Sequence, residues 1–205
     1  MYVVERRNVL DNSVSVEDMA EDTAEIMKNC GITKAYLYGV SQGGVMVQLI
    51  AAKHPELVEK AVIVSSTSRI NDMVRNVMSS FIEKLHAGQL QALGEDFAEK
   101  LYAPETIKQF PSLKTIDPNI PEINLKNFEI MARDCMYGET DAILDRIKCP
   151  VLVIGGKLDR VYGEEENIYL AERLNCRYIS YEKFGHAVYD ECPEVLKEVY
   201  RFFIS

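Results

Sequence analysis

The sequence predicts an α/β protein: a mainly parallel sheet flanked by helices, with one helical insertion. Three observations predict this class. Short β-branched and aromatic runs alternate with amphipathic segments, the strand signal stops between residues 70 and 146, and it returns at Val151. Strands alternating with helices are typical of a parallel sheet covered on both faces. We expect residues 1–69 and 147–205 to form one core, with residues 70–146 as a helical lid or cap insertion.

The first part of the core is expected to alternate strand and helix. Ser15 begins a capping box, in which a hydroxyl and the Asp18 carboxylate satisfy free amides at a helix start. A later helix is apolar nearly all round, as expected when a helix is buried against a sheet. The expected elements are strands at 2–5, 35–38 and 60–65 and helices at about 15–31 and 43–54.

The insertion carries helical periodicity and no strand signal. Apolar residues recur at helical spacing over about 70–85, 90–101 and 125–136, prolines interrupt the stretch before the last of these, and a short helix is expected at 141–146. Large apolar residues here could line an acyl pocket, although an ordinary helix core is the commoner role of such residues. They are Met73, Met78, Phe81, Phe97, Phe128 and Met131.

After the insertion, strands and helices are again expected to alternate. Strands are expected at 151–154 and 177–181, with a helix at 164–174 between them. A closing helix is expected at 193–204, with Pro193 in its first turn, where proline is tolerated.

Composition excludes several classes of function. The 205 residues are 47% hydrophobic and 27% charged, which is the balance of a folded globular protein. A net charge of −9 without a basic block argues against nucleic acid and anionic membranes as partners. Five scattered cysteines, no CxxC pair and no signal peptide lead us to expect a cytoplasmic protein with reduced thiols and no metal.

The most informative segment is Gly39-Val40-Ser41-Gln42-Gly43-Gly44, which fits G-x-S-x-G between an expected strand and an expected helix. A serine on such a tight turn projects clear of the sheet, and the helix N-terminus favours developing negative charge. Gly39 and Gly43 are expected to permit the close backbone approach in this nucleophile elbow. The alternative is a glycine-rich turn with an incidental serine.

A nucleophilic serine needs a base, and the chain has three histidines. His54 and His86 both lie where a helix is expected to end, a position that suits histidine for structural reasons. His186 directly follows the last expected strand, and sites gather at the carboxyl ends of strands in open α/β sheets. His186 is therefore the predicted base, against the alternative of a solvated loop histidine.

The base needs an acid to orient it and to stabilise its cation. Asp159 lies just past the strand at 151–154, although aspartate often occupies such turns for structural reasons. Asp190 and Glu164 are weaker candidates, because neither follows a strand end so closely.

The chain order Ser41, Asp159, His186 together with G-x-S-x-G resembles the α/β-hydrolase fold family, serine-nucleophile branch, over nearly the whole chain. The resemblance implies that Ser41 attacks a carbonyl with His186 as base and Asp159 as its acid partner. An acyl-enzyme forms, and water then releases the acid. It also implies that the backbone N–H of Gln42 is one of two oxyanion donors.

One departure from the family pattern bears on activity. The second oxyanion amide usually comes from a loop marked His-Gly, which occurs nowhere in this chain, and only about forty residues precede Ser41. The first three strands and the oxyanion loop of the family are therefore expected to be absent. Loss of one donor would impair hydrolysis. An uncovered sheet edge leads us to expect a homo-oligomer, most simply a dimer.

The sequence thus predicts a serine hydrolase, carboxylesterase-like (class EC 3.1), that acts on small, fairly apolar esters or related acyl compounds without a cofactor. It does not choose between a carboxylesterase, a lactonase, a thioesterase and a C–C bond hydrolase. The alternative is a truncated, weakly active or inactive hydrolase scaffold that serves as an oligomeric interaction module. A nucleotide-binding βαβ domain is disfavoured, because residues 39–44 lack G-x-G-x-x-G spacing.

Overall fold

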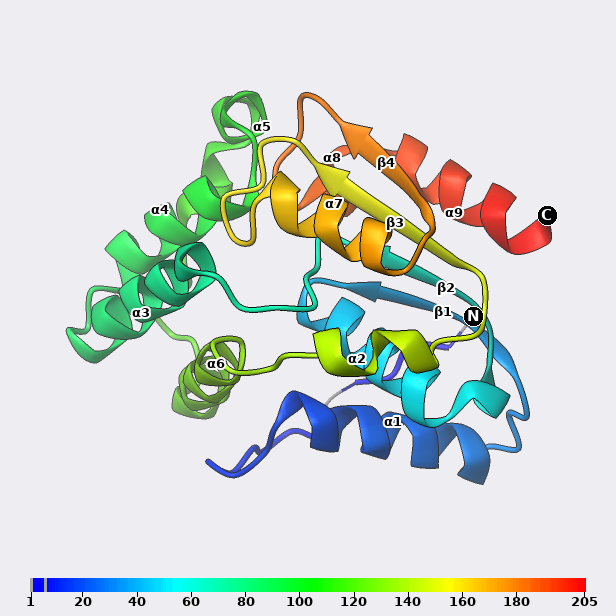
Figure 1. The fold of residues 1–205 in the computed structure, drawn as a ribbon. Helices are drawn as coiled ribbons and strands as arrows, with labels where there is room; N and C mark the ends of the chain where they lie inside the picture. Colours follow the sequence, from blue (N-terminus) through cyan, green and yellow to red (C-terminus); the bar gives the residue numbers. More distant parts are fainter. Residues whose placement is uncertain (1, 6) are drawn as a thin grey trace.

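The four strands of the sheet lie side by side in chain order (Figure 1). The structure is a computed structural model that describes residues 2–5 and 7–205. In these residues the strands are β1 (Ala35–Val40), β2 (Val58–Val64), β3 (Val151–Gly156) and β4 (Arg177–Tyr181). Each neighbouring pair is parallel, so every strand delivers its C-terminal loop to the same edge of the sheet. The predicted α/β class is confirmed.

Helices cover the two faces of the sheet. Successive residues of a strand point to opposite faces, and the core divides accordingly. Ile63 packs with α1 (Val16–Asn29), α2 (Gln42–Lys53) and α7 (Glu164–Arg173). Val62 packs instead with α8 (Val188–Glu191) and α9 (Glu194–Ile204). The capping box at Ser15 forms as predicted.

The helices of residues 70–146 gather beyond the C-terminal ends of the strands (Figure 1). They are α3 (Asp72–His86), α4 (Leu90–Leu101), α5 (Pro104–Gln109) and α6 (Glu122–Asp134). Short 3-10 helices occupy Pro111–Lys114, Asp141–Arg146 and, in the core, Pro55–Leu57. The segment at 141–146 is therefore a 3-10 helix rather than an α-helix. The boundaries of the insertion as a separate domain stay a prediction.

The large apolar residues of the insertion mostly form a helix core. The rings of Phe81, Phe97 and Phe128 form one cluster, with centroids 5.5 to 6.2 Å apart. Met78 is buried in the same cluster, Met131 packs against the core of the sheet, and Met73 is exposed. Of the two roles considered for these residues, ordinary packing is the one that the contacts show.

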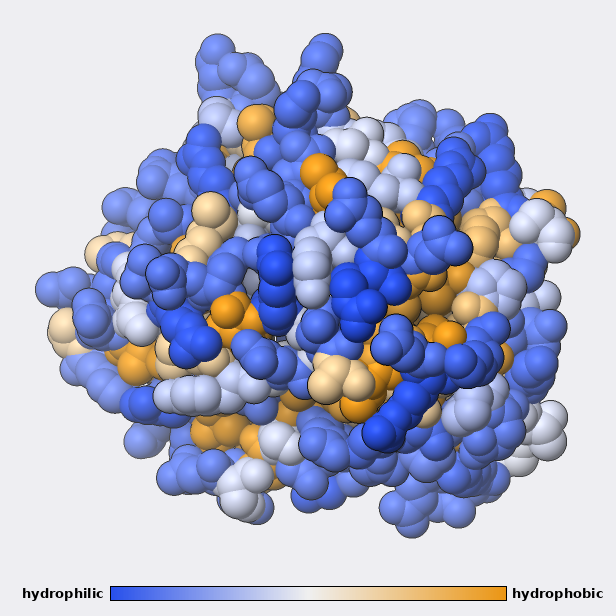
Figure 2. Space-filling view, in the orientation of Figure 1, coloured by the Kyte–Doolittle hydropathy of each residue, from blue (hydrophilic) through white to orange (hydrophobic). Residues whose placement is uncertain are grey.

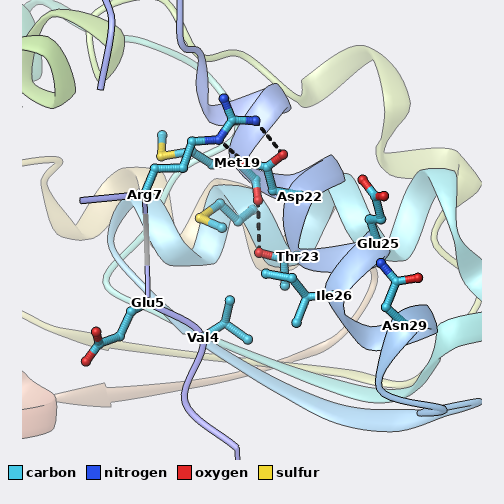
Figure 3. Close-up of a pocket in the computed structure, with 10 residues that line it drawn as sticks. Val4, Glu5, Arg7, Met19, Asp22, Thr23, Glu25, Ile26 and Asn29 are labelled. Atoms are coloured by element: carbon cyan, nitrogen blue, oxygen red, sulfur yellow. Dashed lines mark hydrogen bonds and ion pairs between the residues drawn. The ribbon is translucent and has the colours of Figure 1, made fainter. Parts of the chain in front are cut away.

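The predicted strand at 2–5 is wrong, because these residues form no strand. Val4, Glu5 and Arg7 lie against α1 instead, around a cavity of about 280 Å³ (Figure 3). Arg7 is anchored there by a two-pronged ion pair to Asp22, 2.7 Å at each contact. An extended segment becomes a strand only where a neighbour supplies ladder hydrogen bonds. Among the described residues, β1 pairs with β2 alone and is the edge of the sheet.

Figure 2 shows a largely hydrophilic face on which apolar side chains emerge in separate patches. None of the helices formed by residues 2–5 and 7–205 has the length and apolar character needed to cross a membrane.

Candidate active site

Ser41 occupies a strained turn between β1 and α2. Its φ of 54° and ψ of −124° lie in a region that residues with a side chain rarely adopt. Such strain costs on the order of 1–3 kcal/mol, so the surroundings must hold it. The Ser41 N–H donates to the Val64 carbonyl at 2.9 Å, and the Ser41 carbonyl accepts from the Ser66 hydroxyl at 2.8 Å. The loop after β2 thus fixes the serine at the C-terminal edge of the sheet.

Close packing around this turn requires glycine at two positions. A Cβ at Gly39 would lie 2.2 Å from the Gly43 carbonyl oxygen, and one at Gly44 would lie 2.6 Å from Ser66 Cβ. A Cβ at Gly43 would meet nothing within 4 Å. The steric requirement predicted for Gly39 is present, whereas the second one belongs to Gly44 rather than Gly43.

Asp159 and His186 form a buried pair. His186 Nδ1 lies 2.9 Å from Asp159 Oδ2, and the two side chains are 4% and 0% exposed. The other carboxylate oxygen accepts the backbone N–H groups of Val161 and Tyr162, at 2.8 and 3.1 Å. Burial alone would raise the pKa of Asp159, but the imidazole and the two amides outweigh it and lower that pKa.

The charge of Asp159 sets the tautomer of His186. An ionised carboxylate can only accept hydrogen bonds, so Nδ1 must carry the proton that is shared with Asp159. Nε2 then has a free lone pair and can act as a base. This is the arrangement that a serine–histidine–aspartate mechanism requires.

Tyr162 connects Ser41 with the Asp159–His186 pair. The Tyr162 side chain lies close enough to Ser41 to interact with it, and the Tyr162 ring centroid lies 5.4 Å from that of His186. No direct hydrogen bond joins Ser41 to His186 in the part of the chain that the structure describes. Hydrogen bonds in a resting site are often long and tighten only when substrate binds.

Gln42 is the first residue of α2, so its backbone N–H has no acceptor within the helix. None of the described residues accepts from it either. Its side chain is fixed elsewhere, because Gln42 Nε2 donates to Asp134 Oδ2 at 2.6 Å. Asp134 also accepts the Val16 N–H at 3.0 Å. The end of α6 is thereby tied to the starts of α1 and α2.

The cavity beside Ser41 is small. The cavity lined by Gln42, Asp134, Cys135 and Tyr162 holds only about 10 Å³, roughly the space of one water molecule. Small-molecule sites usually offer about 300–1,000 Å³. A groove of about 830 Å³ lies along α5 and the loop after β4, but neither Ser41 nor His186 lines it. Ser41 itself is partly exposed, whereas His186 is buried.

Glu191 joins the junction between α4 and α5 to the loop that carries His186. Its carboxylate accepts the Ala103 N–H at 2.8 Å and the Thr106 hydroxyl at the start of α5. It also accepts the Gly185 N–H at 2.8 Å, one residue before His186. The Ala187 N–H donates to the Leu101 carbonyl at 2.8 Å. A movement of the α4–α5 junction would therefore be transmitted to His186.

The weaker candidates from the sequence lie elsewhere. Asp190 accepts the Tyr102 hydroxyl at 3.0 Å, and Glu164 contacts the Ser180 hydroxyl. His54 caps α2 and pairs with Glu21 at 2.8 Å, while His86 ends α3 and pairs with Glu129 at 3.0 Å. Both histidines therefore have the helix-terminal role that was considered for them.

Tyr162, Asp134 and Glu191 are site residues that the sequence reasoning missed. Tyr162 lies three positions after Asp159, so its closeness to the acid could have been found from the sequence. Asp134 and Glu191 reach the site from other helices, and no pattern in the sequence marks them. Among the described residues, no three His, Cys, Asp or Glu side chains are grouped so that they could hold a metal ion.

Comparison with known proteins identifies the family to which this chain belongs. The family model described as alpha/beta hydrolase fold matches residues 5–193. An esterase/lipase-named protein of Haemophilus influenzae is 28% identical over 200 residues, which cover 90% of this chain and 65% of that protein. The pimeloyl (acyl-carrier protein) methyl ester esterase of Neisseria meningitidis serogroup A is 26% identical over 190 residues, covering 84% and 58%. The chain thus spans less than two thirds of the length of either relative.

Solved structures show the same fold. An α/β hydrolase enzyme from a Medee basin deep-sea metagenome library superposes with a TM-score of 0.86 at 20% identity, covering 96% of this chain and 74% of that one. The enol-lactonase of Burkholderia xenovorans superposes with a TM-score of 0.81 at 18% identity, covering 94% and 74%.

Proposed function

Because this chain belongs to the alpha/beta hydrolase fold family, we propose that it is a serine hydrolase of small, fairly apolar esters or related acyl compounds. The observation that carries the proposal is the buried Asp159–His186 pair beside a serine on a strained strand-to-helix turn. The relatives named as esterases support ester-type substrates. Within that class a carboxylesterase is the proposed activity.

The proposed reaction has two halves. Ser41 Oγ bonds to the carbonyl carbon, its proton passes to His186 Nε2, and the carbonyl π electrons move onto oxygen. When the tetrahedral species collapses, the ester C–O bond breaks and the departing alcohol takes the proton from His186. Water then attacks the acyl-enzyme and gives up a proton to His186. When this second tetrahedral species collapses, the bond from the carbonyl carbon to Ser41 Oγ breaks, Ser41 takes that proton back, and the acid is released. The Gln42 N–H donates to the oxyanion in both halves.

Turnover of p-nitrophenyl acetate, butyrate and octanoate tests this function. We expect kcat/KM to be higher for the two shorter esters, and Ser41→Ala to abolish hydrolysis of all three. Ser180→Ala, which removes an exposed hydroxyl on β4, is the control and is expected to leave turnover unchanged. Ester turnover that survives in Ser41→Ala would contradict the proposal.

A second candidate function is a weakly active or inactive scaffold that self-associates. No strand formed by residues 2–5 and 7–205 pairs with the outer side of β1, which favours this candidate because unpaired strand groups form a template for another strand. Tyr36 and Tyr38 are 50% and 39% exposed on this strand. The proposed occupant of the edge is β1 of a second copy, which would give a dimer.

Light scattering at micromolar concentration tests the dimer. Lysine on an edge strand opposes pairing, so Tyr36→Lys is expected to give a monomer, whereas Tyr137→Lys, an exposed tyrosine outside the sheet, is expected to stay dimeric. A wild-type protein that is strictly monomeric would rule out this candidate.

A further inference from the structure

Tyr162 contacts all three residues of the candidate triad. Its backbone N–H donates to Asp159 Oδ1 at 3.1 Å, and its ring lies against the His186 imidazole, tilted by 59°. Its side chain lies close enough to Ser41 to interact with it. The position of this hydroxyl is therefore fixed relative to the nucleophile, the base and the acid together.

Packing on the other side holds Tyr162 in this place. The side chain is among the largest that are fully buried, and it belongs to the apolar cluster of the insertion helices. Its carbonyl accepts Asn71 Nδ2 at 2.9 Å, and Asn71 is the N-cap of α3. This burial and the bond to Asn71 hold Tyr162 against the start of α3.

The chemistry of the hydroxyl suits a hydrogen-bond donor. Burial raises the pKa of Tyr162 well above its usual value, Cys135 raises it further, and Ser41 opposes the shift only in part. The phenol therefore keeps its proton at neutral pH. Tyr162 also lines the same small cavity as Gln42, whose N–H is the first candidate oxyanion donor.

The position of the hydroxyl suits the same role. In the tetrahedral species, Ser41 Oγ and the oxyanion are bonded to one carbon, so a donor that reaches Oγ is adjacent to the oxyanion. A donor that is already held beside the developing charge stabilises the transition state, because it needs no reorganisation at the moment of reaction. Tyr162 thus combines a retained proton, a fixed location and closeness to the reacting atoms.

We propose that Tyr162 is a catalytic residue whose hydroxyl donates the second hydrogen bond to the oxyanion formed on Ser41, beside the Gln42 N–H. This inference rests on the proposed hydrolase function. No proton leaves Tyr162: its O–H···O bond strengthens as the carbonyl oxygen gains charge and weakens again when the acyl-enzyme forms.

Steady-state hydrolysis of p-nitrophenyl butyrate by the wild type, Tyr162→Phe and Tyr181→Phe tests the proposal. Tyr181 is a half-buried tyrosine of β4 that packs on Phe184, and its variant serves as the matched control. We expect Tyr162→Phe to lower kcat about 10²–10³-fold with little change in KM, since the bond is made in the transition state. Tyr181→Phe is expected to keep wild-type kcat.

The outcomes distinguish the role of Tyr162 from the proposed hydrolase function itself. A kcat for Tyr162→Phe within about threefold of wild type, or above it, would overturn the role of Tyr162 and leave the hydrolase function standing. A folded wild type without ester turnover would overturn both. If Tyr162→Phe does not fold, 3-fluorotyrosine at this position alone keeps the shape and strengthens the donor. An altered kcat at constant KM then supports the proposal, and an unaltered kcat contradicts it.

Discussion

His186 Nδ1 lies 2.9 Å from Asp159 Oδ2 in a pocket that excludes solvent from both side chains. The two residues come from loops that follow different strands, β3 and β4. Because these strands are parallel neighbours, their C-terminal ends meet at one edge of the sheet. The contact is thus a consequence of the strand order, and it turns two separate loop residues into one unit.

Replacing Asp159 by Asn tests this unit through activity. Asn keeps the shape but can hold His186 in the wrong tautomer, and an equivalent change in a serine protease costs about 10⁴-fold in kcat. We expect a loss of that order in ester turnover. A kcat close to wild type would show that Asp159 does not orient the base.

We also expect the effect of Asp159→Asn on the free energy of unfolding to depend on pH. The pKa of folded Asp159 lies below its usual value of 3.8, so its stabilisation is complete well above pH 3.8 and is lost as pH falls through the folded pKa. The free energy of unfolding of wild type should therefore exceed that of Asp159→Asn at neutral pH by about 1.5–3 kcal/mol, and the gap should close below about pH 4. Urea unfolding followed by circular dichroism measures it. A gap that is constant with pH would contradict this account.

The glycines of the turn give a matched set of variants. Gly39→Ala and Gly44→Ala would force a Cβ into contacts of 2.2 and 2.6 Å, so both are expected to lower the melting temperature and the rate of ester turnover. Gly43→Ala meets no atom and replaces a glycine in α2. It should therefore stabilise by up to about 1 kcal/mol. Thermal melts compare the three, and equal effects at positions 39, 43 and 44 would contradict the packing described.

Glu191 is expected to act as a latch between the α4–α5 junction and the His186 loop. Glu191→Gln leaves the backbone donors of Ala103 and Gly185 without a carboxylate partner. We expect a loss of about 1–3 kcal/mol in stability. Amide hydrogen exchange should become faster at residues 101–106 and 185–187. Asp190→Asn, at a carboxylate that accepts the Tyr102 hydroxyl and is not bonded to Ala103 or Gly185, is the control. Unchanged amide exchange in Glu191→Gln would show that Glu191 does not hold the α4–α5 junction to the His186 loop.

Phe81 tests whether the insertion residues pack a core or line an acyl pocket. Its side chain is buried against Phe97 and Phe128. Phe81→Ala is expected to lower the free energy of unfolding by about 3–5 kcal/mol and to leave the preference among acyl chain lengths unchanged. Phe110→Ala, at an exposed phenylalanine, should cost about 0.5 kcal/mol or less. A shift toward longer esters in Phe81→Ala would assign it to the pocket.

Local pattern was enough to predict most elements. β4 has the predicted bounds, Arg177–Tyr181, and α1 begins at the predicted capping box. The segment at 2–5 failed for a physical reason: its β-branched residues suit a strand, but strand formation depends on a partner that local sequence does not reveal. The short helix expected at 141–146 is present as a 3-10 helix, Asp141–Arg146, a type that the sequence pattern did not specify.

The residues of the candidate site also fall into those that the sequence could predict and those that it could not. Ser41, Asp159 and His186 could be selected because each follows a strand, and parallel strands bring such loops together. Asp134, Tyr162 and Glu191 depend on how the insertion helices close over the sheet edge. No spacing rule encodes that closure, so these contacts emerge only from the folded structure.

The central claim is that Ser41 is an activated nucleophile, and covalent labelling measures it most directly. Folded wild-type protein is treated with a fluorophosphonate, and the adduct is located by intact-mass and peptide mass spectrometry. The account predicts one adduct on the peptide that contains Ser41, no adduct in Ser41→Ala, and much slower labelling in His186→Asn. A folded wild type that stays unmodified, or equal labelling of Ser41→Ala, would contradict it.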